Sequence, residues 1–215
     1  ADHADTYPDV LAAQNALGID IASIRVLIHQ FVTLLKSGEK VKMSTRKATF
    51  VTLEELINQV GSDVVRYFFI MRSMNSHLNF DLDLATDQSE NNPVYYLQYA
   101  HARICNIIKN GAEKGLSVTG EFDRTLLSDD SAISLIKFLV EFPEVMVIAL
   151  KKLEPHGIAN YLHHMSAEFH KFYAKCRVIT DDSDISTARL NLIAAVKIVL
   201  DNGLGVLGIR APERM

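Results

Sequence analysis

NPVYYLQYAHARI, residues 92–104, is the stretch that decides the fold of the second half of the chain. Asn91-Asn92-Pro93 is a turn signal that typically precedes a helix, and the residues after it follow a helical period. At 100° per residue, the apolar side chains and one histidine fall on a single stripe, which predicts a buried face. That stripe consists of Val94, Leu97, His101, Ile104, Cys105 and Ile108.

The opposite side of this helix carries Tyr95, Tyr99, Arg103 and Asn106, with Tyr96 at its edge. Tyrosines in a row beside an arginine can stack on unpaired nucleobases, which contributes about 1–3 kcal/mol per base. They can equally pack against a neighbouring helix, with the arginine side chain passing beside them to water. The residues alone leave both interpretations open.

Helical periodicity continues almost to the end of the chain. It predicts helices at 93–110 (closed by Gly111), 131–141, from Pro143 to Leu153, 158–179 and 185–202. Helices joined by such short connections are typical of an α-helical bundle. The predicted core stripe of the helix at 158–179 consists of Leu162, Met165, Phe169, Phe172 and Cys176.

The first part of the chain mixes helices and strands. The β-branched residues at 23–35 predict a strand, either regular or bulged. The chain is expected to turn at Ser37-Gly38-Glu39 into a second strand at 40–44. Helices are predicted at 10–17, 53–60 and 63–71, with a loop or short extended piece at 73–83. We therefore interpret residues 1–40 as the end of an α/β nucleotide-binding fold. The expected domains are residues 1–90 and residues 91–215.

Positive charge gathers in one segment of a chain whose formal net charge is −4. From Lys36 to Lys47 there are five basic residues and one acidic residue, with hydroxyl side chains between them. Ammonium, guanidinium and hydroxyl groups together bind phosphate oxygens, so this segment is a candidate nucleotide site. A solvated turn is the alternative, because runs of charge usually lie in water.

The composition fits an ordinary globular protein, with 48% hydrophobic and 22% charged residues among 215. No apolar run approaches the roughly 20 residues of a membrane-spanning helix. The two cysteines are far apart in sequence, so we expect reduced thiols in a cytoplasmic protein. Three histidines and Glu168 lie close together at 163–170, but they form no HExxH motif. A solvated face is favoured there, and no metal site is predicted.

Four segments resemble arginyl-tRNA synthetases, which are class I aminoacyl-tRNA synthetases. The string Lys-Met-Ser-Thr-Arg-Lys at 42–47, followed by Phe-Val-Thr-Leu at 50–53, resembles their KMSK-type loop. Residues 92–104 resemble the first helix of their all-helical, DALR-type anticodon-binding domain. Residues 77–83 and 172–178 are similar to a connecting segment and to a segment near the anticodon surface.

This resemblance implies a mainly α fold, in which a helical anticodon-binding bundle follows the carboxyl-terminal remnant of an α/β Rossmann-like catalytic domain. It implies an arginine–tRNA ligase that uses ATP with Mg²⁺, arginine and the tRNA for arginine, and acts as a monomer. Because the chain begins at Ala1 inside the expected catalytic fold, we expect a fragment that is inactive alone and binds tRNA weakly. The alternative is a stand-alone RNA-binding helical module without catalysis.

The resemblance also assigns residues. The loop residues that would stabilise pyrophosphate during adenylation are Lys42, Ser44, Arg46 and Lys47. Thr45 stands where the general motif has a second lysine, so Arg46, Lys47 or a lysine elsewhere would replace it. Substrate contacts are expected from Asp2, His3 and Gln30. Anticodon contacts are expected from Tyr95, Tyr99, Arg103, Tyr173, Arg177 and Met215.

Overall fold

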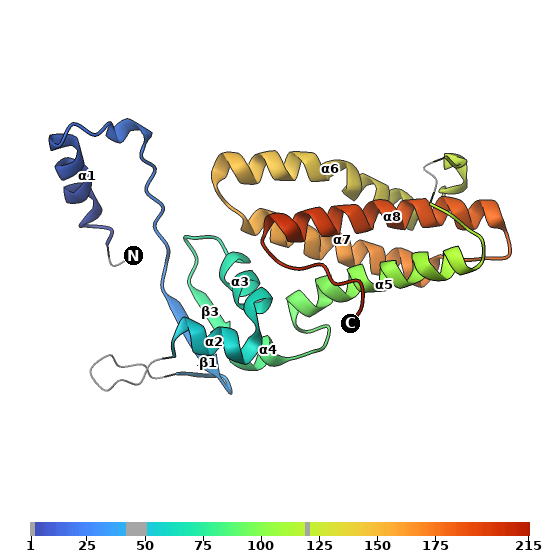
Figure 1. Ribbon diagram of the computed structural model, residues 1–215, viewed down its shortest axis with the longest axis horizontal. Coiled ribbons are helices and arrows are strands. Elements are labelled where there is room, and N and C mark those ends of the chain that lie inside the picture. Colours follow the sequence, from blue (N-terminus) through green and yellow to red (C-terminus); the bar gives the residue numbers. More distant parts are fainter. Residues whose placement is uncertain (1–2, 42–50, 119–120) are drawn as a thin grey trace.

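The computed structural model describes residues 3–41, 51–118 and 121–215. Its larger part is a bundle of four long helices that run along the longest dimension of the molecule (Figure 1). They are α5 (Pro93–Glu113), α6 (Asp130–Lys152), α7 (His156–Lys175) and α8 (Ser183–Val206). Helices α7 and α8 each pack against the other three, so the core lies along them. The expected helical bundle is confirmed.

The smaller part holds a three-stranded sheet in the order β2-β1-β3. Its strands are β1 (Val32–Lys36), β2 (Glu39–Lys40) and β3 (Leu78–Asp81). Strand β1 is antiparallel to β2 and parallel to β3. The turn between β1 and β2 places Ser37 at φ 52° and Gly38 at φ 76°, which are the left-handed angles that a tight two-residue hairpin turn requires.

The smaller part also holds three short helices. They are α2 (Leu53–Val60), α3 (Ser62–Ile70) and α4 (Leu82–Thr86). Helix α2 begins with a capping box, in which the Thr52 hydroxyl accepts from the Glu55 N–H at 3.1 Å and the Glu55 carboxylate accepts from the Thr52 N–H at 2.8 Å. Helix α3 packs against both α5 and α7, so it fixes the smaller part to the bundle.

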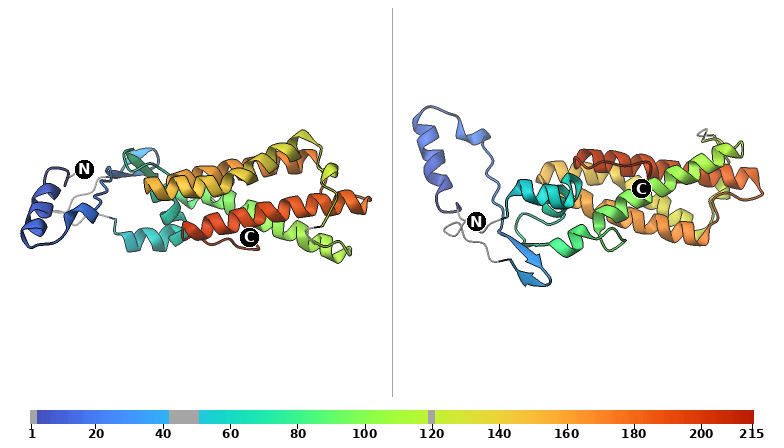
Figure 2. Two further views of the ribbon diagram at one scale, coloured as in Figure 1. Left: turned by 90° about the horizontal axis from the view of Figure 1, so that it is seen from above. Right: turned by 60° about the horizontal axis from the view of Figure 1, so that its bottom comes forward.

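The start of the chain differs from the prediction. Helix α1 (Tyr7–Ala16) buries none of its residues and stands apart from the bundle in every view (Figures 1 and 2). It is followed by the 3₁₀ turn η1 (Ile21–Ser23). The predicted strand at 23–35 is wrong over 24–31, which form no strand; β1 begins only at Val32. A strand needs a hydrogen-bonding neighbour, and β3 pairs only with residues 32–35.

Several predicted helix ends are also wrong. Helix α6 continues through Pro143, whose ring lies on the exposed side, where water can bond the carbonyl group that the missing N–H leaves free. Gly111 lies within α5 instead of ending it, because α5 and α8 approach closely there. A Cβ atom at Gly111 would lie 2.9 Å from Cδ1 of Leu190. Helix α7 ends at Lys175, four residues before the predicted position.

The predicted core stripes are largely confirmed. In α7, all five residues of the stripe at 162–176 are buried. In α5, Val94, Leu97, His101 and Ile104 are buried, whereas Cys105 and Ile108 are half-buried. A short 3₁₀ turn, η3 (Arg124–Leu126), precedes α6. Across the described ranges, no helix combines the length and the apolar character needed to span a membrane.

Candidate nucleic-acid interface

Helix α5 starts at a rigid corner. The Asn92 side-chain oxygen accepts from the backbone N–H groups of Val94 and Tyr95, at 3.0 and 3.5 Å. Its amide nitrogen donates to the carbonyl groups of Asp87 and Ala85, at 2.9 and 3.3 Å. Asn92 is therefore an N-cap and also a tie to the preceding turn. This double role sets the direction in which α5 leaves and the face on which its tyrosines lie.

An aromatic and cationic array runs along that face. The rings of Tyr95 and Tyr99 are nearly parallel, with centroids 6.2 Å apart and an interplanar angle of 8°. The Arg103 guanidinium donates to the Tyr99 hydroxyl at 2.7 Å and lies 4.4 Å from the ring centroid of Tyr173 on α7. The stacked rings and the cation therefore form one continuous surface across two helices.

The charge of Arg103 is secured within this array. Partial burial disfavours the charged form, but interactions with the phenols of Tyr173 and Tyr99 outweigh it and raise the pKa of Arg103 overall. The guanidinium remains half-buried and stays positively charged. A permanent cation between aromatic rings can stack on a base or bond a phosphate.

On this face of α5, one tyrosine packs against a neighbouring helix, whereas two others keep part of their rings open to solvent. Tyr96 packs against His163 and His170 of α7, with ring centroids 5.1 Å away in both cases. Tyr95 and Tyr99 are only half-buried, so part of each ring faces solvent. Burial lowers the pKa of His170, which Arg103 lowers further against an opposing effect of Glu90. The neutral form of the His170 imidazole is therefore favoured, and this ring packs against both Tyr96 and Tyr99.

The carboxyl-terminal segment crosses this helix and is tied to it. Gln98 donates through Nε2 to the Asp63 carboxylate at 3.1 Å and to the Arg210 carbonyl at 2.9 Å. The Arg210 Nε–H donates to the same Asp63 oxygen at 2.9 Å. His101 lies with Nδ1 at 2.9 Å from the Pro212 carbonyl, to which it donates. These contacts join α3, α5 and the last residues of the chain.

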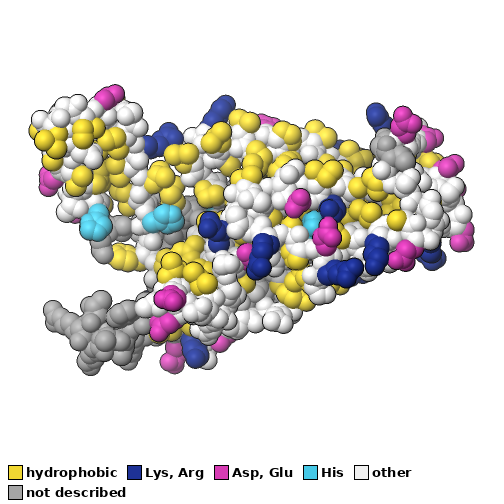
Figure 3. All heavy atoms as spheres, in the orientation of Figure 1, with side chains coloured by type: hydrophobic (Ala, Val, Ile, Leu, Met, Phe, Trp, Pro, Cys, Tyr) yellow, Lys and Arg dark blue, Asp and Glu magenta, His cyan; other side chains and the backbone are white. Residues whose placement is uncertain are grey.

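A groove of about 710 Å³ lies between α5, Tyr173 and this segment. Its wall includes the exposed side of Arg103, the side chain of Met215 and the polar groups of α5 beyond Tyr99. Three basic residues and one acidic residue line it, namely Arg103, Lys109, Arg214 and Glu213. Basic side chains are visible over α5 and the chain's end in Figure 3. Aromatic rings beside a locally positive groove suit an unpaired nucleic-acid strand.

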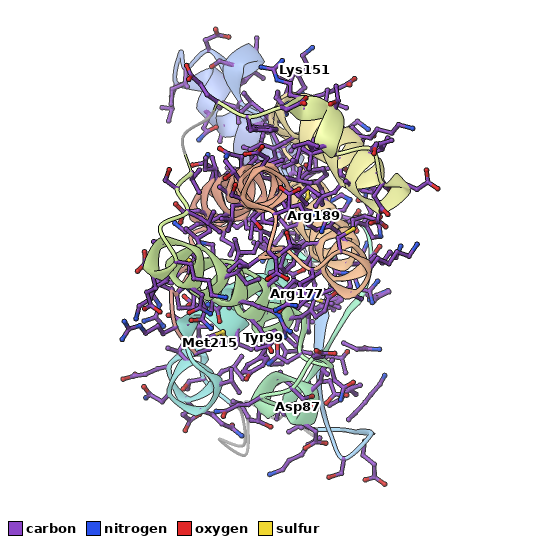
Figure 4. The ribbon with its side chains drawn as sticks, turned by 90° about the vertical axis from the view of Figure 1, so that its right-hand side faces the viewer. Asp87, Tyr99, Lys151, Arg177, Arg189 and Met215 are labelled. Atoms are coloured by element: carbon purple, nitrogen blue, oxygen red, sulfur yellow. The ribbon has the colours of Figure 1, made fainter. Side chains whose placement is uncertain are left out.

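Five of the six predicted anticodon residues meet around this groove. Tyr99, Arg103, Tyr173 and Met215 line it, and Tyr95 stacks on Tyr99. Arg177 is exposed and lines the next hollow along α7, which it shares with Tyr173. Tyr99 and Met215, which both line the groove, are labelled next to each other in Figure 4. Sequence reasoning missed Asp63, Gln98 and Lys109; the available signal was the polar Gln98 between Leu97 and Tyr99.

Of the residues predicted to act in catalysis or to contact the substrate, the structure describes two, both predicted as substrate contacts. Lys42, Ser44, Arg46, Lys47 and Asp2 lie outside the described residues. His3 is exposed ahead of α1, where its carbonyl accepts from the backbone of the following turn. Gln30 is half-buried, and its N–H donates to the Met74 carbonyl at 3.0 Å.

The histidine-rich face of α7 has other partners. Glu168 bonds Ser134 at 3.0 Å and Lys171 at 2.5 Å, which lower the pKa of its carboxyl. His163 and His170 face Tyr96. In the part of the chain that the structure describes, no three His, Cys, Asp or Glu side chains converge to hold a metal ion.

Comparison with known proteins identifies the helical part. Residues 97–215 match the family model described as the DALR anticodon binding domain, which is more than half of the chain. The chain belongs to this family. Residues 2–96 of this DALR-family chain match the model described as tRNA synthetases class I (M).

Curated relatives agree with both matches. The DALR-family chain is 50% identical to an arginine–tRNA ligase of Salinibacter ruber and 48% identical to one of Desulfotalea psychrophila. These alignments cover 100% of this chain but 38% and 39% of the relatives. The chain thus spans about two fifths of the length of the curated relatives it matches.

Solved structures share the fold. A structure described as an arginyl-tRNA synthetase of Campylobacter jejuni superposes with a TM-score of 0.85 at 29% identity, over 100% of this chain and 46% of that one. Thermus thermophilus arginyl-tRNA synthetase gives 0.63 at 23% identity, over 85% of this chain and 34% of that one. The arrangement of the DALR bundle beside a small α/β part is therefore that of these neighbours, which confirms the expected fold class.

Proposed function

We propose that this chain is the tRNA-recognition part of an arginine–tRNA ligase, with a bundle at 91–215 that binds the anticodon and a catalytic remnant at 1–90. The array at the groove carries the proposal. Tyr95 and Tyr99 would stack on unpaired bases, while Arg103 and Tyr173 would hold a neighbouring base or phosphate. Arg177 and Met215 would contact the strand at either side.

In the complete enzyme, the cationic loop would act at the other end of the tRNA. Lys42, Ser44, Arg46 and Lys47 would stabilise the pyrophosphate that leaves ATP, and Mg²⁺ bound with the nucleotide would supply further positive charge. Asp2 and His3, with Gln30, would contact arginine. Such catalysis consists of positioning and charge stabilisation, so it needs the rest of the nucleotide site. We expect the 215-residue chain to bind tRNA weakly as a monomer and to show no arginine-dependent ATP–pyrophosphate exchange.

Binding of an arginine-accepting tRNA to the 215-residue chain, followed by fluorescence anisotropy, tests the proposal. Tyr99→Ala removes one stacking ring and the hydroxyl that orients Arg103, so the affinity should fall by about 1–3 kcal/mol, or roughly 5- to 150-fold. Tyr7→Ala, on the distant helix α1, is the matched control and should change the affinity little. Equal losses in the two variants would contradict the assignment of the groove.

The alternative function makes a different prediction. A stand-alone RNA-binding module would bind unrelated hairpins as well as the arginine-accepting tRNA. An anticodon-binding domain should prefer the cognate loop, and exchanging the loop bases should reduce the affinity. Adenylation by the chain alone would contradict the expected fragment role without affecting the RNA-binding assignment.

A further inference from the structure

The aromatic groove continues into a second hollow of about 430 Å³ at the far side of Tyr173. The two share Ile107, Asn110 and Tyr173, so they form one continuous depression between α5 and α7. The second hollow differs in charge. Its lining includes Lys114, Lys175 and Arg177, and no Asp or Glu.

These three cations are available for a ligand. Lys114, Lys175 and Arg177 are all exposed, and none forms an ion pair within the described ranges. Hydrogen bonds from Ser131 are the main cause of the lowered pKa of the Asp129 carboxyl, and Lys175 has the smallest effect on that pKa. Three like charges around one small hollow repel one another unless an anion neutralises them.

The backbone that carries Arg177 is held in place. The Arg189 guanidinium of α8 donates to the Arg177 carbonyl at 2.7 Å, just after the end of α7. Figure 4 labels both arginines on this part of the bundle. Lys114 and Lys175 could each simply complement the negative end of the helix that they terminate. That role does not account for Arg177, which lies beyond α7 and lines the same hollow.

We propose that Lys114, Lys175 and Arg177 form a phosphate-binding site for the RNA backbone, next to the bases held at Tyr99 and Tyr173. This proposal rests on the proposed function. The ligand class is a phosphodiester of a single-stranded segment, because the hollow opens from the aromatic groove and offers cations without an acceptor carboxylate. A guanidinium can grip two phosphate oxygens, while the two lysines supply point charges and the Asn110 amide a neutral donor.

Salt dependence distinguishes such phosphate contacts from general attraction. For single strands, each phosphate contact contributes about 0.7 to the slope of log affinity against log salt concentration. The double variant Lys114→Gln/Lys175→Gln should therefore lower the slope by about 1.4. Between 50 and 200 mM salt, the wild type should then lose about sevenfold more affinity than this variant. Lys151→Gln/Lys152→Gln, at the end of α6, removes the same charge away from the hollow and should leave the slope nearly unchanged.

Neutral backbone linkages give a second readout. A loop RNA with methylphosphonate linkages beside the stacked bases should bind the wild type more weakly than the native RNA does. The Lys114→Gln/Lys175→Gln variant should discriminate much less between the two RNAs. Inorganic phosphate at millimolar concentration tests whether a free anion binds the same site. If it does, phosphate should compete with the native RNA but not with the methylphosphonate RNA. A thermal melt of each variant checks that the fold is kept.

The outcomes separate this proposal from the proposed function. If Tyr99→Ala weakens binding but both lysine pairs give the wild-type slope, the phosphate site is refuted and the aromatic groove stands. If the wild type binds no RNA, both fail. A slope that falls equally in the two lysine pairs would show general attraction and would also overturn the site.

Discussion

Replacing Gln98 by glutamate tests how the end of the chain is held against the groove. The Gln98 amide donates to the Asp63 carboxylate and to the Arg210 carbonyl, and it is the only described side chain that bonds both. In Gln98→Glu, both donors are lost and a carboxylate of nearly the same shape stands about 3.1 Å from the Asp63 oxygen. The Asp63 side chain is only 12% exposed, so the repulsion is poorly screened.

The expected magnitude follows from these contacts. A hydrogen bond to a charged group contributes about 1.5–3 kcal/mol, and the new repulsion adds to its loss. The Arg210 side chain is 82% exposed, so its attraction to two carboxylates is weakened by water and offsets little. We expect docking of the terminal segment to weaken by about 2–4 kcal/mol, which raises its undocked population roughly 30- to 700-fold. The bundle itself should melt at nearly the same temperature.

Trypsin cleavage after Arg210 measures that population, because cleavage needs the segment to leave the surface. Mass spectrometry of the loss of residues 211–215 should show much faster cleavage in Gln98→Glu than in the wild type. Gln14→Glu on α1 carries the same charge change without these contacts and should cleave at the wild-type rate. Equal rates in the two variants would refute the view that Gln98 anchors the segment.

Two further predictions concern the bundle. Gly203→Ala should destabilise it by about 1–3 kcal/mol, because the new Cβ would lie 2.6 Å from Cδ2 of the fully buried Leu162. Gly205→Ala lies in the same helix and meets open space, so it should stabilise the bundle by about 0.5–1 kcal/mol. Thermal melts of both variants measure these changes. A change in stability of the same sign in both variants would contradict this packing. Burial lowers the pKa of His170, so the unfolded chain binds the proton more readily and stability should fall as the pH falls through about 6.5. In His170→Phe, the melting temperature should depend less on pH between 7.5 and 5.5, because unfolding then takes up as much as one proton fewer. An unchanged pH dependence would show that other groups cause it.

Local sequence signals were sufficient for many elements. Helices α2 and α5 each begin at a cap formed by residues that are close in sequence. These are the capping box of Thr52 and Glu55 and the N-cap Asn92. The buried stripe of α5 follows from helical spacing alone. Because Tyr95, Tyr99 and Arg103 are four residues apart, their shared face could be predicted in the same way.

Contacts between distant segments could not be read from local patterns. The position of Tyr173 over Arg103 depends on how α7 packs on α5. The tie between Asp63 and Arg210 joins residues that are 147 positions apart. The apolar residues at 24–31 have the composition of a strand, but in the described ranges they make only isolated backbone hydrogen bonds, at Gln30 and Phe31, and join no strand ladder. Likewise, Gly111 has the position of a helix stop, but close packing against Leu190 keeps it within α5.

Base stacking at the groove is the claim that can be measured most directly. An anticodon stem-loop with 2-aminopurine in the loop reports stacking through quenching of its fluorescence. The account predicts additional quenching when the 215-residue chain binds, at a loop position that Tyr99→Ala and Arg103→Ala both affect and Tyr7→Ala does not. Saturable binding with unchanged or increased fluorescence at every loop position would contradict it.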